Sequence, residues 1–338
     1  MSLPSTNDPS VARTRARLAD GSARIAVLKG GMSAERAVSL KSGKAVAGAL
    51  RERGWDVVEI DVQPDLPARL IEAAPDVAWL ALHGPFGEDG CVQGLLEIMR
   101  IPYTGSDVRG SAVAMDKIAT KRMLRDTEVR LPSDAVWELG EPMPEGLDLP
   151  LIAKTPRGGS TIGIQRVTDS SELESALLSL SEMDAVVLLE QLIEGCEVTV
   201  AVLDGHALPV VEIRPLQREG FFDFEAKYTE GCTEYIVPAP ISEAAAQDAR
   251  SQAVAAYTRL GLAGIARADF IVDAEDRAWF LEVNTIPGMT ATSLSPMAAG
   301  EAGTSFGELV EHIARSATLH VDRARDQDTL EPGKVTSS

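Results

Sequence analysis

Two segments near the C-terminal end, residues 267–273 and 278–285, constrain the fold more than any other part of the chain. Both are rich in β-branched and aromatic residues, which is typical of strands. The acidic pair Glu275-Asp276 between them is a turn candidate. Together they predict an antiparallel hairpin, preceded by an amphipathic helix at residues 242–260.

The expected hairpin places four polar side chains on one face. If it is symmetric about its turn, Asp269 lies opposite Glu282, and the same pairing places Arg267 opposite Asn284. Side chains alternate faces along a strand and opposed side chains point the same way, so all four converge. Opposed carboxylates repel each other, and a hard cation such as Mg²⁺ with oxygen ligands removes that cost. The alternative is a solvated face on which Arg267 neutralises a carboxylate.

The charge of the chain restricts its partners. Its 338 residues include 32 basic and 51 acidic side chains, which gives a net charge of −19. A chain this acidic binds nucleic acid and anionic membranes poorly, so we expect neither as a partner. A bound nucleotide would need locally placed lysines and a metal. The composition, 45% hydrophobic and 25% charged, is that of a globular chain long enough for two or three domains.

The ends and the cysteines indicate a reduced, cytoplasmic setting. No signal peptide is expected, and no apolar run approaches the roughly 20 residues of a membrane span. The three cysteines, Cys91, Cys196 and Cys232, are far apart and form no zinc pattern. Residues 1–23 and 321–338 are expected to be loose, disordered tails.

The first part of the chain alternates strands and helices. Apolar runs at 24–28, 57–60 and 77–82 predict strands of a parallel α/β unit. Ligands of such sheets bind at the carboxyl ends of the strands, where the loops 30–35 and 83–90 occur. Neither loop is a GxGxxG, and the chain has no GxxxxGK[ST]. These absences argue against a dinucleotide-dependent dehydrogenase and a P-loop enzyme.

Two later segments are candidates for functional loops. A strand at 149–154 leads into the glycine-rich run 157–163, and spare N–H groups in such a loop can fold over phosphates. Lys154 just before the run favours this interpretation over a plain hairpin loop. The aromatic, charged segment 221–228 is bounded by glycines, and it predicts either an ordered functional loop or a strand edge.

Eight short motifs follow one another in an order and spacing that are specific. They are GGMSAER (30–36), HGPFGEDG (83–90), YTGS (103–106), AMDK (114–117), GSTIG (159–163), EAKY (225–228), LEVNT (281–285) and PGMT (287–290). In these motifs the chain resembles the D-alanine–D-alanine ligase family of the ATP-grasp superfamily, from about residue 24 to about residue 317.

The resemblance implies an ATP-grasp fold, α/β in class and α+β in its ATP-binding part, with ATP held between the second and third of three domains. The N-terminal, Rossmann-like substrate domain is expected at 24–116. The central ATP-grasp domain is expected at 117–212. The C-terminal ATP-grasp domain, with the metal and substrate site, is expected at 213–320.

The same resemblance implies the residues that bind ATP and metal. Groups that face the phosphates, including one in the covering loop, are Lys117, Lys154, Lys227 and Ser160. Groups that contact the adenosine are Glu190 and Glu197. Two Mg²⁺ ions, or Mn²⁺ in their place, would be held by Asp269, Glu282 and Asn284, in agreement with the hairpin geometry.

Substrate residues are implied in the same way. Glu35 would receive the ammonium of the first D-alanine, with His83 nearby; without the resemblance, Glu35 is simply a carboxylate favoured in a first helical turn and His83 a loop histidine. Groups for the oxyanion are Arg267 and the backbone of Gly288. Groups for the carboxylate of the second D-alanine are Ser293 and Leu294. A hydrogen-bonded link across the closed site would join Glu35, Ser160 and Tyr228.

Four positions depart from the family pattern. Ala266 stands where glycine usually precedes the arginine, and Thr155 stands where proline usually follows the strand lysine. Thr161 replaces a serine, and Leu192 replaces an aromatic residue that often flanks the adenine. We expect the function to be kept, with loop closure and base stacking as the properties these residues alter.

The implied reaction suits these groups. A carboxylate is a poor acyl donor, so ATP first converts one D-alanine to D-alanyl phosphate, and the amine of the second attacks it to give D-alanyl-D-alanine for peptidoglycan precursors. Acyl phosphates hydrolyse readily, so water-excluding lids are expected around Ser160 and Tyr228. A homodimer is expected. Two alternatives stay open: a ligase using D-lactate or D-serine as the second substrate, and a nucleotide-binding regulatory subunit without catalysis.

Overall fold

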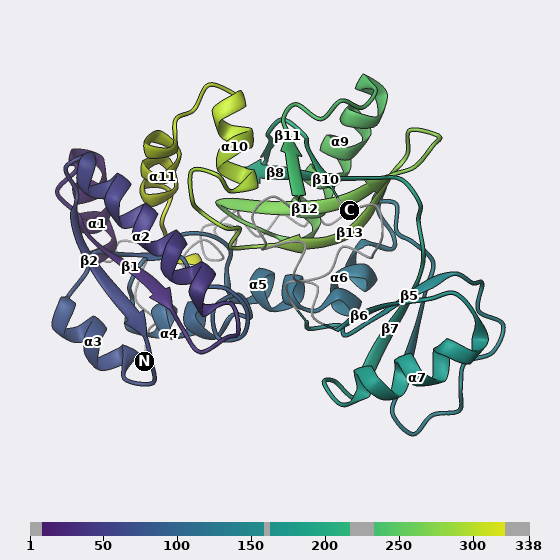
Figure 1. Ribbon diagram of the computed structural model, residues 1–338. Coiled ribbons are helices and arrows are strands. Elements are labelled where there is room, and N and C mark those ends of the chain that lie inside the picture. Colours follow the sequence, from purple (N-terminus) through teal and green to yellow (C-terminus); the bar gives the residue numbers. More distant parts are fainter. Residues whose placement is uncertain (1–8, 159–162, 217–232, 322–338) are drawn as a thin grey trace, which may run out of the picture.

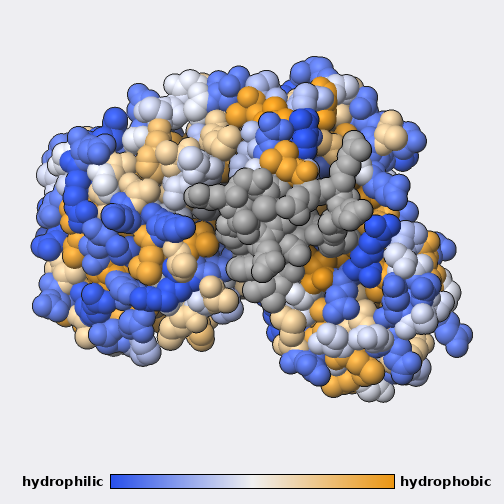
Figure 2. Space-filling view, in the orientation of Figure 1, coloured by the Kyte–Doolittle hydropathy of each residue, from blue (hydrophilic) through white to orange (hydrophobic). Residues whose placement is uncertain are grey.

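The computed structural model describes residues 9–158, 163–216 and 233–321. Within them the chain forms three sheets, which Figure 1 shows arranged along the molecule with helices packed against them. Figure 2 shows a notch between the lobe of the first sheet and that of the four-stranded sheet. No helix of the described ranges is long and apolar enough to cross a membrane. The expected tail at 321–338 lies almost wholly outside these ranges.

The first sheet is parallel, as the alternation of strands and helices predicts, and its strand order is β2-β1-β3. Its strands are β1 (Arg24–Gly30), β2 (Asp56–Val62) and β3 (Val77–Leu80). Its helices are α2 (Arg36–Glu52), α3 (Leu66–Ala73) and α4 (Cys91–Met99). Every residue of β3 is buried, which is typical of a parallel strand covered on both faces. Because β1 and β3 are parallel, the loops that follow them leave the sheet at the same edge, where the carboxyl ends of the strands lie.

The N-terminal segment includes an ordered helix, which corrects the expectation of a loose tail. Helix α1 (Pro9–Asp20) packs beside α11 (Phe306–Arg315). Leu18 is buried in the core cluster that these helices share with the first sheet, and Arg17 Nη1 lies 2.8 Å from Asp76 Oδ2. Arginines separate the few apolar residues of this segment, so its sequence shows no apolar pattern, although Leu18 and Arg17 both hold the helix in place.

A four-stranded antiparallel sheet of order β4-β7-β5-β6 forms the middle of the chain. Its strands, with the helix that covers them, are β4 (Asp134–Glu138), β5 (Leu151–Lys154), β6 (Ile164–Val167), β7 (Val186–Gln191) and α7 (Ser170–Ser181). One face is apolar and packs against α7. Glu190 lies in register with Asp134 and Ile152, so it shares the opposite, polar face with Asp134 and Lys154.

Two short helices precede this sheet, α5 (Val108–Met115) and α6 (Lys117–Leu124). They are separated at Asp116, which is extended (φ −103°, ψ 107°) and whose side chain accepts a hydrogen bond from Ala119 N. This N-cap places Lys117 at the first position of α6, and Lys121 one turn later on the same side of the helix.

The largest sheet is antiparallel, of order β11-β10-β8-β12-β13, with β9 paired to β8. Its strands are β8 (Cys196–Leu203), β9 (His206–Ala207), β10 (Val211–Pro215), β11 (Thr233–Ile236), β12 (Ile265–Val272) and β13 (Ala278–Asn284). The expected boundary at residue 212 falls inside this sheet, because β8 and β9 belong to it. We therefore propose a boundary between β7 and β8, which keeps each sheet whole.

Helix α9 (Glu243–Leu260) covers this sheet and confirms the predicted helix before the hairpin. The Ser242 side chain caps it by accepting a hydrogen bond from Ala245 N. Gly261 ends it in the left-handed conformation (φ 71°), which glycine adopts without strain. Helix α10 (Leu294–Glu301) follows the hairpin and precedes α11.

The hairpin β12–β13 confirms the expected convergence, and we call its four polar side chains the hairpin face. Its two cross-strand pairs are Asp269 with Glu282 and Arg267 with Asn284. Symmetry about the turn is wrong, because a β-bulge follows Asp269 and Phe270 pairs with Phe280. The rings of these two phenylalanines are fully buried, edge to face, with centroids 5.7 Å apart. The bulge thus separates a polar end of the hairpin from an apolar end.

Candidate active site

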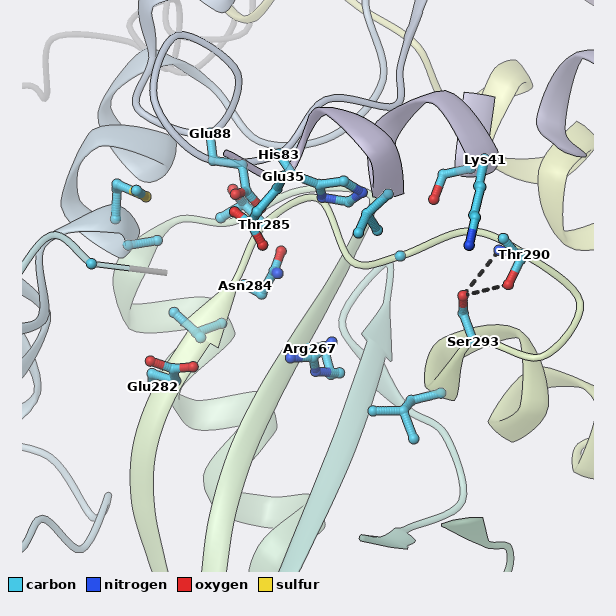
Figure 3. Close-up of a pocket in the computed structure, with 18 of the residues that line it drawn as sticks. Glu35, Lys41, His83, Glu88, Arg267, Glu282, Asn284, Thr285, Thr290 and Ser293 are labelled. Carbon is cyan, nitrogen blue, oxygen red and sulfur yellow. Dashed lines mark hydrogen bonds between the residues drawn. The ribbon is translucent and has the colours of Figure 1, made fainter. Parts of the chain in front are cut away.

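A cavity of about 600 Å³ lies where the loops of the first sheet meet the polar end of the hairpin. Figure 3 shows Glu35, His83 and Glu88 at one end of it, with Arg267 and Glu282 below them. Predicted site residues that line the cavity are Glu35, His83, Lys117, Arg267, Glu282, Asn284, Gly288, Ser293 and Leu294. Predicted residues that do not line it are Asp269, Lys154, Glu190 and Glu197.

Hydrogen bonds fix the two loops of the first sheet to each other. Ser33 Oγ donates to the carbonyl oxygen of His83 (2.7 Å) and accepts from Glu35 N (3.2 Å). Glu35 is the N-cap residue of α2. In the second loop, Glu88 Oε2 accepts a hydrogen bond from Gly84 N (2.5 Å). The first loop thus brings Glu35 to the cavity beside His83 and Glu88, a residue the sequence analysis did not single out.

Two polar atoms at this end are buried and have no hydrogen-bond partner in the described part of the chain, His83 Nε2 and Glu88 Oε1. The two side chains are only 6% and 8% exposed. Burial lowers the pKa of His83, and the charge of Glu35 opposes that shift. Burial, together with the charge of Glu35, raises the pKa of Glu88 to about 8. Both groups are therefore mostly uncharged at neutral pH, and each has an atom left for a ligand.

Arg267 is held by the carboxylate two residues along β12. Its Nε and Nη2 donate to Asp269 Oδ1 and Oδ2, both at 2.9 Å. Thr199 Oγ1 of β8 donates to Asp269 Oδ1 (2.5 Å), and Asp269 is 5% exposed. The salt bridge that the sequence analysis kept as an alternative is thus present. Its bidentate geometry fixes the guanidinium plane, and Arg267 lines the cavity.

Glu282 and Asn284 are the members of the hairpin face that supply oxygens to the cavity. Lys117 Nζ lies 3.0 Å from Glu282 Oε2 and donates to the carbonyl oxygen of Gly158 (2.7 Å). Asn284 Oδ1 accepts from Ile286 N (2.8 Å). The described residues contain no cluster of three or more Asp, Glu, His or Cys side chains that could hold a metal. The cavity therefore receives one carboxylate and one amide oxygen from the hairpin face, which are donor types that Mg²⁺ prefers, while both oxygens of Asp269 are held by Arg267.

The other end of the cavity carries hydroxyl groups and a cation. Ser293 Oγ accepts a hydrogen bond from Thr290 N (3.0 Å) and lies 2.8 Å from Thr290 Oγ1. Figure 3 shows the Lys41 side chain of α2 directed toward this pair. A Cβ at Gly288 would lie 3.3 Å from Ser293 Oγ, so the glycine keeps this end open. Hydroxyl groups and an ammonium have hydrogen-bond donors of the kind that a carboxylate accepts.

Glu190 lies outside this cavity, between two lysines. Lys154 forms an ion pair with its Oε2, and Lys121 Nζ lies 2.5 Å from its Oε1. Lys121 also donates to the carbonyl oxygen of Pro132 (3.0 Å) and lies 3.5 Å from Asp134 Oδ1. Burial raises the pKa of Glu190, but the two lysines outweigh it and the net pKa is lowered. We call Lys121, Asp134, Lys154 and Glu190 the lysine face.

Some predicted residues lie beyond this description, and some functional candidates were missed. Predicted residues outside the described ranges are Ser160, Thr161, Lys227 and Tyr228. Glu197 lies on β8 in register with Ile271. Candidates that the sequence analysis did not assign to the site are Lys41, Glu88, Lys121 and Thr199. Glu88 belongs to the quoted HGPFGEDG motif, whereas the others are revealed only by contacts between distant segments.

The fold and the site define the class of protein. A four-stranded antiparallel sheet with a lysine-bearing polar face, followed by a larger antiparallel sheet with a carboxylate hairpin, is the ATP-grasp fold. The parallel sheet before them contributes the loops that close the substrate end of the cavity.

Comparisons with known proteins resolve the class further. The sequence model of the D-ala D-ala ligase C-terminus matches residues 115–315, and that of the N-terminus matches residues 68–106. The D-alanine–D-alanine ligase of Syntrophotalea carbinolica is 50% identical over 297 residues, covering 88% of this chain and 96% of that one. That of Citrifermentans bemidjiense is 46% identical over 298 residues, covering 88% and 97%.

A solved structure gives the same result. The crystal structure of D-alanine–D-alanine ligase from Bacillus anthracis complexed with ATP has a TM-score of 0.78 at 32% identity, covering 90% of this chain and 100% of that one. The chain therefore belongs to the D-alanine–D-alanine ligase family.

Proposed function

We propose that the protein is an ATP-dependent ligase that joins two D-alanines into D-alanyl-D-alanine, through D-alanyl phosphate, for peptidoglycan precursor synthesis. The observation that carries the proposal is a single cavity with an acid for an ammonium at one end, Glu35, and a carboxylate-binding end at Ser293. Arg267 of β12 lines the same cavity, where its guanidinium can stabilise the negative charge of a tetrahedral intermediate. Family membership supports the same activity.

The end near Glu35 suits the ammonium of the first D-alanine. His83 and Glu88 are mostly uncharged at neutral pH, so Glu35 is the carboxylate that can complement a single positive charge there. Neutral Glu88 has a spare oxygen, and neutral His83 has a spare nitrogen. The three groups together can orient the amino acid so that its carboxylate points toward Arg267.

We propose that Asp269, Glu282 and Asn284 hold two Mg²⁺ ions, which when bound would neutralise phosphate charge during phosphoryl transfer. Asp269 and Glu282 each already contact a cationic side chain, Arg267 and Lys117 respectively. In this proposal Arg267 would stabilise the oxyanion of the intermediate, and Lys117 would stabilise the negative charge of the phosphates. Lys154, Lys227 and the loop of Ser160 would add further contacts to the phosphates, and Glu190 and Glu197 would contact the adenosine.

The decisive experiment is phosphate release from ATP with D-alanine as the sole amino acid, followed by product identification. We expect D-alanyl-D-alanine and ADP in equal amounts, with no appreciable D-alanyl-D-lactate when D-lactate competes at neutral pH. Tyr228→Phe should raise the share of the ester, because the lost hydroxyl loosens the expected link to Glu35. Predominant ester from the wild type would favour the D-lactate alternative, and ATP binding without turnover would favour a regulatory subunit.

We also propose a cytoplasmic homodimer, with Gly220 to Gly231 and the loop of Ser160 as lids. Both loops lie outside the described residues. Light scattering of the purified protein tests the dimer. Limited proteolysis tests the lids, since ATP with a phosphinate mimic of the intermediate should slow cleavage between Gly220 and Gly231; equal rates with and without ligand would contradict the lid proposal.

A further inference from the structure

We propose that Lys121 is a positioning residue for base recognition, which holds the Glu190 carboxylate ready to accept a hydrogen bond from the 6-amino group of adenine. The inference rests on the proposed ligase function and on the expected contact between Glu190 and the adenosine. Lys121 itself would not touch the nucleotide. It would act through Glu190 and thereby set the preference for adenine over purines that carry a 6-oxo group.

The surroundings of Lys121 hold its ammonium group away from water and among oxygen atoms. The side chain is 1% exposed, and a lysine is almost never buried so deeply unless its charge is paired. Its Nζ lies near three oxygens: Glu190 Oε1 at 2.5 Å, the Pro132 carbonyl at 3.0 Å and Asp134 Oδ1 at 3.5 Å. The first two oxygens accept hydrogen bonds from the ammonium, and the Asp134 carboxylate adds a third negative neighbour.

Lys121 differs from the other cation on Glu190 in what else it is expected to do. Lys154 also pairs with Glu190, but its expected partners in the loaded enzyme are phosphate oxygens. Any movement of Lys154 toward phosphate would leave Lys121 as the cation that keeps the buried carboxylate ionised. Asp134 is balanced separately by Arg125, whose Nη2 lies 2.8 Å from Asp134 Oδ2. The remaining pair, Lys121 with Glu190, is then electrically neutral.

Ionisation of Glu190 matters because it decides which base the carboxyl group can bind. An ionised carboxylate only accepts hydrogen bonds, so it suits the 6-amino donor of adenine and repels the 6-oxo acceptor of hypoxanthine. Without Lys121, the charges near Glu190 would be Asp134, Arg125 and a Lys154 shared with phosphate. The buried carboxyl would then gain a proton, donate to the 6-oxo group and lose its preference.

The test compares binding of ADP and of inosine diphosphate by titration calorimetry, because the two carry identical phosphates. We expect the wild type to prefer ADP by roughly ten- to a hundredfold, the usual size of one hydrogen bond to a charged group. Lys121→Met should bring the two affinities within about threefold of each other, as should Glu190→Gln. Lys121→Met added to Glu190→Gln should change the ratio no further, because Lys121 acts through Glu190. Arg122→Met, an exposed cation on the same helix, should leave the ratio unchanged.

Several results would overturn the inference. These are a wild type with no preference for ADP, a folded Lys121→Met protein with the wild-type ratio, and a further shift in the double variant. Should Lys121→Met not fold, Lys121→Gln removes the charge while keeping hydrogen-bond donors, and the same ratio is measured. Failure of the proposed function would be seen separately, as ADP that binds to the wild type without D-alanine-dependent turnover of ATP.

Discussion

On both the lysine face and the hairpin face, carboxylates of a sheet contact cations, but the two faces differ in how exposed those carboxylates are to solvent. On the lysine face, Glu190 is 3% exposed and a lysine occupies each of its oxygens. On the hairpin face, the Glu282 side chain is 35% exposed, and it lies against Lys117 at the cavity. Asp269 lies between these extremes, buried but paired with a single cation that lines the cavity.

This difference indicates what each carboxylate can do. A buried carboxylate needs at least one cation beside it at all times, because a stranded charge is costly, so its contribution is a fixed orientation. A partly exposed carboxylate that lines a cavity can also take a metal ion as a partner. Charge removal should therefore cost stability on the lysine face and activity on the hairpin face.

The largest effect is expected from Glu282→Gln. Loss of this charge should lower ATP turnover by about 1000-fold or more, because a bound divalent cation contributes several kcal/mol to phosphoryl transfer. The melting temperature should stay close to that of the wild type, since the carboxylate is partly exposed. Asp269→Asn should abolish turnover as well and also destabilise the fold, because Arg267 loses the charged, bidentate carboxylate that pairs with it. Glu275→Gln, in the turn of the same hairpin, is the control, and full activity of Glu282→Gln would refute the metal assignment.

Next in size is the stability of the lysine face. Glu190→Leu removes the carboxylate that pairs with two buried lysines and should lower the free energy of unfolding by about 3–5 kcal/mol. The triple variant that also carries Lys121→Met and Lys154→Met should recover most of this loss, because an entire buried ionic group can be replaced by apolar side chains. Urea unfolding with Glu182→Leu, an exposed position, as control measures both. Equal stabilities of the single variant and the wild type would show that the face is not closed as described.

Glu88 provides a test at the cavity itself through pH. Its pKa is 4.5 when unfolded and about 8 when folded, so between these values the folded protein holds a proton that the unfolded chain has released. Stability contributed by this group is therefore present at low pH and falls as pH rises toward 8. Glu88→Gln should remove that slope, so the variant gains several kcal/mol relative to the wild type between pH 5 and pH 8 (about 1.4 kcal/mol per pKa unit). Parallel pH dependences of the two proteins would contradict the shift.

The smallest effect concerns Lys41, an exposed cation at the carboxylate-binding end of the cavity. Lys41→Met should raise the KM for the second D-alanine by roughly fivefold, which corresponds to about 1 kcal/mol for an exposed charge pair, while kcat changes little. Raising the salt concentration should weaken the wild type toward the variant. Lys44→Met, one helical turn further along α2 and outside the cavity lining, is the matched control.

Sequence reasoning reached the hairpin face because its geometry is local. Two strands joined by a short turn fix their own register, and a period of two decides which side chains share a face. Even so, the bulge after Asp269 was not predicted, because no residue type in the two strands marks where the register shifts. The two predicted cross-strand pairs are nevertheless correct. The bulge lies between these pairs and the turn, so the pairing that differs from the prediction is that of the residues nearer the turn.

The lysine face could not be derived in this way. Lys121 and Glu190 are 69 residues apart, and no periodic pattern connects a helix to a strand that pairs with two other strands. The domain boundary predicted at residue 212 was misplaced for a related reason. No local pattern in the sequence indicates that β8 pairs with β12, which lies more than 60 residues later. Helix α1 was missed because its burial depends on α11, at the opposite end of the chain.

That contact between the chain ends has a consequence for synthesis. Helix α11 packs on α2, and Val310 and Ile313 share a core cluster with Leu50 of α2 and Trp79 of β3. A ribosome delivers the first sheet long before residues 306–318, so this core is completed only after that later segment has been made. A nascent chain that stops short of residue 306 leaves the apolar residues of this cluster exposed, so the first sheet must wait for α11 before its core is protected.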